Sequence, residues 1–393
     1  MFRPDSAPVT VLLTALAAVG SFSISIYTPS MPALAVDLAT TADRVKLTLS
    51  VFLVGFAVGQ LVYGPLSDRF GRRVVLLGGL ALYVVGNIAC AAAPTIDVMI
   101  AARFVQALGA CAGPALGRAV VRDVHGREGA ARVLAWIAAA TALSPAIGPT
   151  LGGHMHVWFG WRANFVLLTI LGALLLLAVW RGLGETNLRP DEQATGLSRM
   201  AANYAMLLRH REYLAYLLCG SFLIGGLFAY IAAAPFIFIE RLGVPPDHYG
   251  LLSIFTTGAY MAGAVVTARL NARVPIERMV WIGVMVALAG ALAMLPAALL
   301  EPSAPGILAP MMVFGIGLGI ALPNCLAGGM GPFPRIAGSA SALLGFAQML
   351  AAAGATVTVA ALPQQSVLSL AEVLVTCCVA ALLSRVRLRP LAA

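Results

Sequence analysis

The sequence predicts an all-α polytopic membrane protein, in which twelve transmembrane helices form two six-helix bundles and both termini lie in the cytoplasm. Composition, the lengths of the apolar runs and the placement of basic residues lead to this prediction. Of the 393 residues, 60% are hydrophobic and only 10% are charged, and the mean hydropathy is +0.92. Soluble domains carry roughly 25% charged residues, so this composition indicates a chain embedded in a membrane.

A transmembrane helix needs about 20 mostly apolar residues, and a dozen runs of about that length follow one another along the chain. They occupy residues 9–33, 45–66, 74–93, 97–117, 132–154, 164–183, 212–238, 249–269, 279–299, 305–328, 337–361 and 366–384. The longest polar interval follows the sixth run. It divides the chain into an amino-terminal bundle (1–184), a cytoplasmic linker (185–211) with an amphipathic segment near 200–209, and a carboxy-terminal bundle (212–393).

Basic residues are distributed unevenly between the two sides of the expected membrane. If the amino terminus is cytoplasmic, nearly all the arginines outside the spans fall on the cytoplasmic side, and the other side receives only Arg44, Lys46, Arg162 and Arg241. Cytoplasmic loops are enriched in Lys and Arg, so both termini are expected inside the cell. The net charge of +9 then reflects topology, and we expect no nucleic-acid partner.

The first apolar run predicts a permanent span and not a cleaved signal peptide. The run is too long, it is preceded by a single basic residue, Arg3, and Pro29 and Pro32 stand where cleavage would occur. The six cysteines lie in apolar segments without metal-ligand spacing. We therefore expect them to be small packing residues, and we expect no metal site.

In the first span, hydroxyl side chains interrupt the apolar pattern over residues 21–32, and the two prolines break the helix. The second span carries Gly55, Gly59 and Gly64, at spacings that allow another backbone to come close.

A short polar stretch, residues 64–73, separates the second and third spans. It holds one carboxylate, three guanidinium groups and two glycines, which are Asp68, Arg69, Arg72, Arg73, Gly64 and Gly71. A charge cluster of this kind cannot lie in hydrocarbon, so it predicts a tight turn at the membrane surface.

The fourth span contains Arg103 and Gln106. Arg103 lies about 6–9 Å inside the outer end of that helix, counted at 1.5 Å per residue. Its guanidinium is expected either to extend to the interface or to face an aqueous cavity in the bundle.

The fifth span contains two prolines and three glycines, which are Pro145, Pro149, Gly148, Gly152 and Gly153. Prolines remove backbone donors and glycines weaken the helix, so we expect this span to be bent and packed very closely against a neighbour.

The second half repeats the layout of the first. Arg269 and Arg273 occupy the place of the polar turn, with Ala268 where a carboxylate would stand. Residues 315–324 of the tenth span mirror residues 109–114 of the fourth. Such six-plus-six similarity is typical of transporters built from two related bundles.

These motifs resemble those of the major facilitator superfamily, and more narrowly its drug:proton antiporters of the Bcr/CflA type. Residues 64–73 resemble the signature between helices 2 and 3, residues 103–109 the helix 4 motif, and residues 144–153 the helix 5 antiporter motif. Residues 27–32 resemble the Tyr-Leu-Pro-x-x-Pro end of helix 1. The layout of all twelve spans agrees with the family, while the specific motifs lie in the first half.

The resemblance implies a multi-pass transporter of the bacterial cytoplasmic (inner) membrane that confers antibiotic resistance by multidrug efflux. It works by alternating access, as an antiporter that takes no cofactor and draws energy from the proton gradient. Two departures stand out. Relatives usually carry an acid where this chain has Ser25, and Ala135 and Ser144 replace further glycines of the helix 5 pattern.

The resemblance also implies that Asp68 acts as a conformational latch. Its carboxylate would lie near the positively polarised start of helix 11, and Gly64 would let that helix come close. Arg69 or Arg72 would hold the turn through charge-assisted hydrogen bonds. A solvated turn that follows the positive-inside rule would explain the arginines, but not Gly64 and Asp68 together.

A proton-coupled exporter needs a group that gains and loses a proton during the cycle. No carboxylate lies in the middle of helices 1, 4, 7 or 10. The candidates are Asp68, Glu372, which lies within the twelfth span, and His154; simple facilitated efflux is the alternative. His154 and His156 do not share a helical face, so they are not expected to bind a metal.

Polar and aromatic side chains on helices that could border a central cavity are candidates for substrate contact. They are Tyr27, Asn87, Gln106, Phe222, Phe228, Tyr230, Asn324 and Gln348, and each aromatic could instead be a core or lipid-facing residue. Few charges are available there, which favours a neutral or lipophilic drug-like substrate over sugar phosphates or peptides. Membrane lipids are the other expected partners, and the protein is expected to be a monomer.

Three other classes compete with this interpretation. The first is an importer or facilitator of a small neutral metabolite. The second is a membrane-embedded enzyme, but the spans contain no Ser/His/Asp set, no HExxH and no Gly-x-Ser-x-Gly, so no enzymatic activity is expected. The third is a membrane sensor, which would carry a soluble domain that no interval here is long enough to form.

Overall fold

The computed structural model describes residues 7–124, 127–187, 191, 195–362 and 366–387. All regular secondary structure in these residues is helical, and twelve helices are long and apolar enough to cross a membrane. The predicted all-α class and number of spans are confirmed.

The first bundle begins with a broken span. Helix α1 (Ala7–Ser25) ends ahead of the short η1 (Thr28–Ser30) and α2 (Met31–Asp37), because Pro29 and Pro32 interrupt the helix. The other helices of this bundle are α3 (Ala42–Phe70), α4 (Arg72–Ala91), α5 (Ile96–Val124), α6 (Arg127–Phe159) and α7 (Arg162–Gly182).

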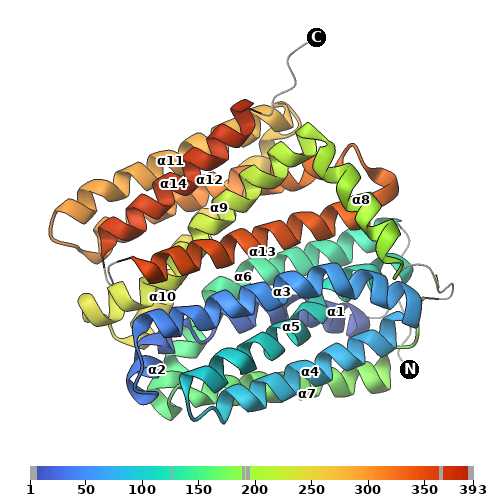
Figure 1. Ribbon diagram of the computed structural model, residues 1–393, viewed down its shortest axis with the longest axis horizontal. Coiled ribbons are helices and arrows are strands. Elements are labelled where there is room, and N and C mark those ends of the chain that lie inside the picture. The colour runs from blue at the N-terminus through green and yellow to red at the C-terminus, as the bar shows by residue number, and fades with distance from the viewer. Residues whose placement is uncertain (1–6, 125–126, 188–190, 192–194, 363–365, 388–393) are drawn as a thin grey trace.

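A short helix, α8 (Leu197–Arg209), precedes the second bundle. That bundle begins with α9 (Arg211–Pro235), which continues into the π-helical η2 (Phe236–Arg241). It is completed by α10 (Pro246–Leu270), α11 (Ile276–Leu299), α12 (Ala304–Met330), η3 (Pro334–Ile336), α13 (Ala337–Ala361) and α14 (Val367–Arg387). Figure 1 shows this bundle above the first one, with α8 at one end of the helices.

Helices extend further into the polar segments than the apolar runs indicated. The tight turn expected over residues 64–73 is reduced to Gly71, and α3 remains helical through Asp68 to Phe70. Charged side chains in water do not oppose helix formation, so only a conformational break ends α3. Gly71 supplies it with a φ of 94°, which glycine adopts without the strain that a Cβ would cause.

The two bundles pack their helices in the same pairwise order. Helices α4 and α5 pair in the first bundle as α11 and α12 pair in the second, and α1 packs on α5 as α9 packs on α12. A Cβ on Gly109 of α5 would lie 2.3 Å from the backbone nitrogen of Tyr83. On Gly317 of α12 it would lie 2.3 Å from that of Ala287. Both pairs therefore bring backbones into direct contact.

Two helix pairs join the bundles, α3 with α13 and α6 with α10. Helix α13 lies directly above α3 in Figure 1. We call the two contacts the α3/α13 seam and the α6/α10 seam. The end of the molecule that carries α8, Ala7 and Arg387 is the α8 end, and the opposite end is the far end.

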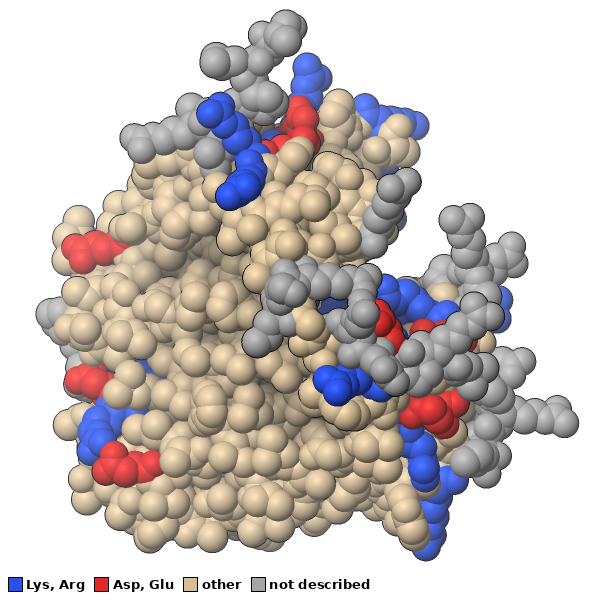
Figure 2. Space-filling model, turned by 45° about the vertical axis from the view of Figure 1, so that its right-hand side comes forward, with Lys and Arg blue, Asp and Glu red and all other residues tan. Residues whose placement is uncertain are grey.

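Charged side chains gather at the two ends of the molecule. On the face shown in Figure 2, a broad band without Lys, Arg, Asp or Glu separates the charged groups of the far end from those of the α8 end. Many large apolar side chains on the helices are exposed, among them Trp136, Ile170 and Leu292. This is the surface that a lipid bilayer covers.

Candidate functional site

The predicted latch residues form a charge network around Gly71. Arg72 pairs with Asp68 at 2.5 Å and with Asp123 of α5 at 3.0 Å, and it donates to Ser67 Oγ at 2.5 Å. One guanidinium thus ties α3, α4 and α5 together. Arg73 donates to the carbonyl oxygen of Trp180 at 2.7 Å and attaches α7 to the same corner.

Glu185, at the start of the linker, completes this network and was not singled out from the sequence. Its carboxylate accepts the backbone N–H groups of Arg72 at 2.8 Å and Arg73 at 3.1 Å, the first free donors of α4. The carboxylate also occupies the space that a Cβ on Gly71 would need, since that atom would lie 2.5 Å from Glu185 Oε2. A carboxylate at a helix N-terminus is stabilised by the helix dipole.

The linker makes further contacts with the end of α3. Asn187 donates to the carbonyl oxygen of Asp68 at 2.9 Å, and the backbone N–H of Asp191 donates to the same oxygen at 3.0 Å. Arg69 donates to Thr195 Oγ1 at 2.7 Å. The part of the linker that the structure describes is therefore attached to the first bundle at the latch residues.

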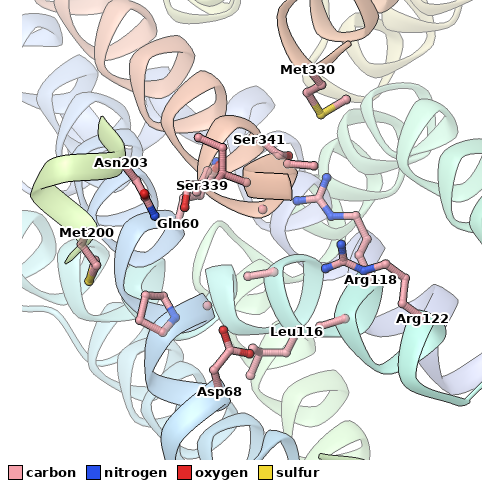
Figure 3. Close-up of a pocket in the computed structure, with 18 of the residues that line it drawn as sticks. Gln60, Asp68, Leu116, Arg118, Arg122, Met200, Asn203, Met330, Ser339 and Ser341 are labelled. Atoms are coloured by element: carbon pink, nitrogen blue, oxygen red, sulfur yellow. The ribbon is translucent and has the colours of Figure 1, made fainter. Parts of the chain in front are cut away.

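A cavity of about 540 Å³ opens between the two bundles at the α8 end. The first bundle contributes α3, α5 and α6, the second contributes the end of α12 and the start of α13, and α8 closes one side. Figure 3 shows Arg118 and Arg122 extending from α5 into the space that faces Ser339 and Ser341 of α13. Apolar groups such as Leu116, Met200 and Met330 share the lining.

Asp68 and Gly64 line this cavity together with the first residues of α13, Ala337 to Ser339. A Cβ on Gly64 would meet nothing within 4 Å, and the carboxylate of Asp68 pairs within its own corner. The eleventh span, which is α13, therefore does not come close to Gly64 in this conformation, because the cavity separates the two bundles here. The latch stays a prediction for the conformation in which this end closes.

Arg103 is completely buried and has no carboxylate partner among the described residues. It donates to Gln106 Oε1 at 2.6 Å and to the carbonyl oxygen of Ser23 at 3.3 Å. The rings of Tyr27 and Phe52 lie 4.1 and 4.2 Å from its guanidinium carbon and stabilise the cation. In this conformation Arg103 neither reaches an interface nor lines the cavity at the α8 end.

Gln106 links Arg103 to the third span. It donates to Asn87 Oδ1 at 2.6 Å, and Asn87 donates to the carbonyl oxygen of Tyr83 at 2.7 Å. The hydroxyls of Tyr83 and Ser23 lie 2.7 Å apart, and this hydrogen bond connects the network to α1. We call Ser23, Tyr83, Asn87, Arg103 and Gln106 the polar cluster; it connects α1, α4 and α5 within the first bundle.

The helix 5 motif, residues 144–153, lies in α6 and packs against the end of α1. Ser25 donates to the carbonyl oxygen of Ser144 at 3.1 Å, and a Cβ on Gly148 would lie 2.1 Å from Ser25 Oγ. A Cβ on Gly152 would lie 1.7 Å from the carbonyl oxygen of Ile26. The predicted close packing of this span is present, although α6 continues without a break through Pro145 and Pro149.

The same motif also builds the α6/α10 seam. A Cβ on Gly153 would lie 2.3 Å from the carbonyl oxygen of Pro246, and one on Gly250 would lie 2.4 Å from that of Pro149. Thr150 Oγ1 donates to the carbonyl oxygen of Gly250 at 3.0 Å. These contacts lie in the half of the helices towards the far end, so the bundles touch there backbone to backbone.

The remaining proton-carrier candidates lie away from the cavity at the α8 end. Glu372 is exposed on α14, and the ring of His154 contacts the carbonyl oxygen of Thr150 at 2.8 Å and the indole of Trp158. Asp68 is the candidate that lines the cavity. All three remain predictions.

The candidate substrate contacts of the second bundle are also outside that cavity. Phe228, Tyr230, Asn324 and Gln348 are buried, and Phe222 is half-buried. Asn324 donates to the carbonyl oxygen of Ile320 at 2.8 Å, while its Oδ1 and the Nε2 of Gln348 are buried without a hydrogen bond. Tyr27 and Asn87 are engaged with Arg103 and Gln106 in the first bundle, as described above.

Comparison with known proteins identifies the family. The family model described as Major Facilitator Superfamily matches residues 13–356. The chain belongs to the Major Facilitator Superfamily. The predicted membership is confirmed, and the protein is a multi-pass membrane transporter of this superfamily.

Two relatives within the superfamily carry names that refer to resistance. The "Chloramphenicol resistance protein" of Pseudomonas aeruginosa is 33% identical over 349 residues, which cover 87% of this chain and 81% of that protein. The "Multidrug resistance protein D" of Escherichia coli (strain K12) is 30% identical over 368 residues, covering 93% of this chain and 91% of that one. These names agree with the Bcr/CflA resemblance of the motifs.

Solved structures show the superfamily fold. A structure titled "Crystal structure of D-xylose-proton symporter" matches with a TM-score of 0.76 and 16% sequence identity over 96% of both chains. The two six-helix bundles described above are thus the arrangement of this superfamily.

Arg118, Arg122 and Gln60 line the cavity but were not candidates at the sequence level. The two arginines were counted only as positive charges near the membrane surface, although their spacing of four places both on one face of α5. Gln60 lies on the same α3 helix as Gly64, one turn earlier, and that spacing could have identified it.

Proposed function

We propose that the protein is a multidrug efflux transporter that exports neutral or lipophilic compounds by alternating access, as a drug:proton antiporter. The cavity between the two bundles carries this proposal, because it opens at the α8 end while glycine contacts hold the bundles together towards the far end. A site reached from one side only is the state that alternating access requires. The names of the two relatives support drug compounds as substrates.

The orientation follows from the charges. The α8 end carries Asp68, Arg69, Arg72, Arg73, Arg118 and Arg122 of the first bundle. By the positive-inside rule this end faces the cytoplasm, in the cytoplasmic membrane of a bacterium. A drug in the cytoplasm or inner leaflet would therefore enter the cavity directly. The proposal includes a monomeric protein in a lipid bilayer, powered by the proton gradient without a cofactor.

The cavity lining supports amphiphilic substrates. Leu116, Leu134 and Met330 offer apolar surface, and Gln60 offers a side chain that can donate and accept hydrogen bonds. Asp68, Arg118 and Arg122 also line the cavity, so it holds more charge than the sequence indicated. Pockets of this mixed kind orient a ligand with few polar contacts and bind it through apolar area.

The deciding experiment is a drug-susceptibility panel in a bacterial host that lacks its own efflux pumps. Expression should raise the inhibitory concentration of chloramphenicol or other amphiphilic drugs at least fourfold, and a protonophore should abolish the drug efflux measured in cells. A panel without any change in resistance would overturn the proposal.

The importer alternative is tested separately, by direction. Inside-out vesicles with an acidified lumen should accumulate the drug, since their lumen corresponds to the cell exterior. Loss of preloaded drug from these vesicles on acidification would favour an importer.

A further inference from the structure

Lys46 is the only lysine in the sequence. All other residues in the Lys and Arg total of 25 are arginines. Arginine stays protonated in proteins, whereas lysine can lose its proton when it is buried. Among the lysine and arginine side chains, Lys46 is therefore the one that burial can deprotonate, so its position in the fold matters.

That lysine is buried between the two bundles at the far end. It lies in the second turn of α3, and 2% of its side chain is exposed. The second bundle surrounds it with Phe236 of η2, Val359 of α13 and Ser369 of α14. These residues enclose a cavity of about 10 Å³, which has room for about one water molecule. The amine of Lys46 is thus enclosed at the far end of the α3/α13 seam.

The charged groups that act on Lys46 are few. Asp43, one turn earlier on α3, places a carboxylate oxygen 3.9 Å from the ammonium nitrogen, and Glu240 of η2 adds a weaker attraction. Arg241, next to Glu240 on η2, carries the same charge as Lys46. Helix α13 contains no charged residue. On α14 the nearest charge is Glu372, one turn beyond Ser369 and exposed. Helix α9 carries its charged residues, Arg211 and Glu212, at the opposite end.

These contacts leave the ammonium weakly compensated. The ion pair with Asp43 is beyond hydrogen-bond distance, and the ring of Phe236 lies 5.2 Å from the nitrogen. Burial between the bundles disfavours the charged form of an amine, while the two carboxylates favour it. Parting of the bundles at the far end would place the same amine in water, where it is protonated. Charge and conformation are therefore linked.

We propose that Lys46 is the gating residue of the far end, where its amine takes up a proton from solution as the two bundles part and returns the proton to solution as they close. One proton is bound on opening and one is released on closing, and no other bond changes. A low pH then favours an open far end, and a high pH favours a closed one. The inference rests on the alternating access of the proposed function.

The test measures opening of the far end directly and needs no drug. Ser369 is buried beside Lys46 on the other side of the seam, so a Ser369→Cys substitution places a thiol that reacts only when the seam parts. Thr95→Cys, in the exposed far-end loop between α4 and α5, is the matched control for the reactivity of a thiol at each pH. The protein is reconstituted in lipid nanodiscs and labelled with a hydrophilic maleimide from pH 6 to pH 9.

The labelling rate of the Ser369→Cys protein, divided by that of the Thr95→Cys control, should fall at least threefold as the pH rises. In Lys46→Met, which is never charged, the ratio should be low and independent of pH. In Lys46→Arg, which is always charged, it should be high and independent of pH. Labelling of the parent protein gives the background from the native cysteines.

A structural cation would give a different pattern. Arginine could replace lysine in the contacts with Phe236 and Asp43, so a Lys46→Arg protein with the wild-type pH profile would overturn the proposal. A flat wild-type profile, or a pH dependence that survives in Lys46→Met, would also overturn it. If drug transport fails while the labelling behaves as expected, the proposed drug efflux is wrong and the proton-linked gate stands.

Discussion

The two bundles share their packing and differ in their polar groups. Glycines bring α4 against α5 and α11 against α12. A Cβ on Gly109 or on Gly317 would lie equally close to a backbone nitrogen of the neighbouring helix. The polar cluster around Arg103 and the charge network around Gly71 lie in the first bundle.

The second bundle carries other residues at these places. Counted from Gly317 and Gly109, α12 has Met311 and Phe314 where α5 has Arg103 and Gln106. Arg269 near the end of α10 and Arg273 just beyond it are exposed. The packing is thus repeated in both bundles, whereas the polar groups differ: the second bundle buries Arg385 of α14, over the ring of Tyr216.

This difference teaches that repeated architecture and function are specified separately. Removal of a shared glycine contact should harm both bundles alike, whereas removal of a group of the polar cluster or of the charge network around Gly71 acts on the first bundle. Four paired predictions test this, from the largest expected effect to the smallest.

The shared glycine contacts should be the most sensitive positions. Gly109→Ala and Gly317→Ala each place a Cβ 2.3 Å from a backbone nitrogen of the neighbouring helix, so the helices must separate. We expect both variants to lower the yield of monodisperse purified protein more than tenfold. Gly78→Ala and Gly258→Ala are the controls, because a Cβ there meets nothing within 4 Å and alanine favours a helix by about 1 kcal/mol over glycine. Equal yields of all four would show that the contacts are unimportant.

The latch should come next. Asp68→Asn removes the charge that pairs with Arg72 and lines the cavity, and we expect transport to fall at least tenfold at a normal yield of protein. Arg269→Gln, in the corresponding turn of the second bundle, should retain transport within twofold. Drug efflux from energised cells, normalised to protein in the membrane, measures both. Full transport by Asp68→Asn would refute the latch.

Arg103 tests whether a buried charge is present for function or for stability. A buried charge without an ion-pair partner costs free energy, because it has lost its hydration. We therefore expect Arg103→Met to lose about tenfold in transport without a lower melting temperature. Asn324→Leu, in the mirrored helix, should retain transport within twofold, since it removes an amide oxygen that has no hydrogen bond. A lower melting temperature with normal transport would make Arg103 a structural residue.

The helix cap by Glu185 should give the smallest effect. Glu185→Gln removes the charge that accepts the first N–H groups of α4, a loss of about 1 kcal/mol. For a protein of this size the melting temperature should fall by about 2 °C. Glu301→Gln, an exposed glutamate in the far-end loop between α11 and α12, should leave it unchanged. An equal effect of both substitutions would mean that the cap contributes nothing specific.

Most of the fold could be predicted from local patterns in the sequence. Long apolar runs predicted twelve spans, because only helices satisfy their own backbone in lipid, and Pro29 and Pro32 predicted the break in the first span. Helix ends were placed less well. Residues 64–70 were predicted to form a turn because they are charged, but α3 continues through them. Charged side chains indicate contact with water, and they do not indicate where a helix ends.

Long-range contacts were beyond the sequence. Glu185 lies more than a hundred residues from the helix it caps, and nothing near it indicates that partner. Arg103 was expected at an interface or a cavity. The rings that enclose it, Tyr27 just after α1 and Phe52 of α3, cannot be foreseen from its own helix. The burial of Lys46 likewise depends on helices from the other bundle.

The backbone contacts of the α6/α10 seam have a consequence for energy conservation. Where Gly153 meets Pro246 and Gly250 meets Pro149, the two helices touch so closely that a Cβ on either glycine would collide with the backbone of the other helix. The seam is therefore closed by the backbones themselves, and Thr150 adds a side-chain hydrogen bond to the carbonyl oxygen of Gly250. In the proposed transporter, a far end closed in this way would limit the leak of ions through the protein between transport cycles.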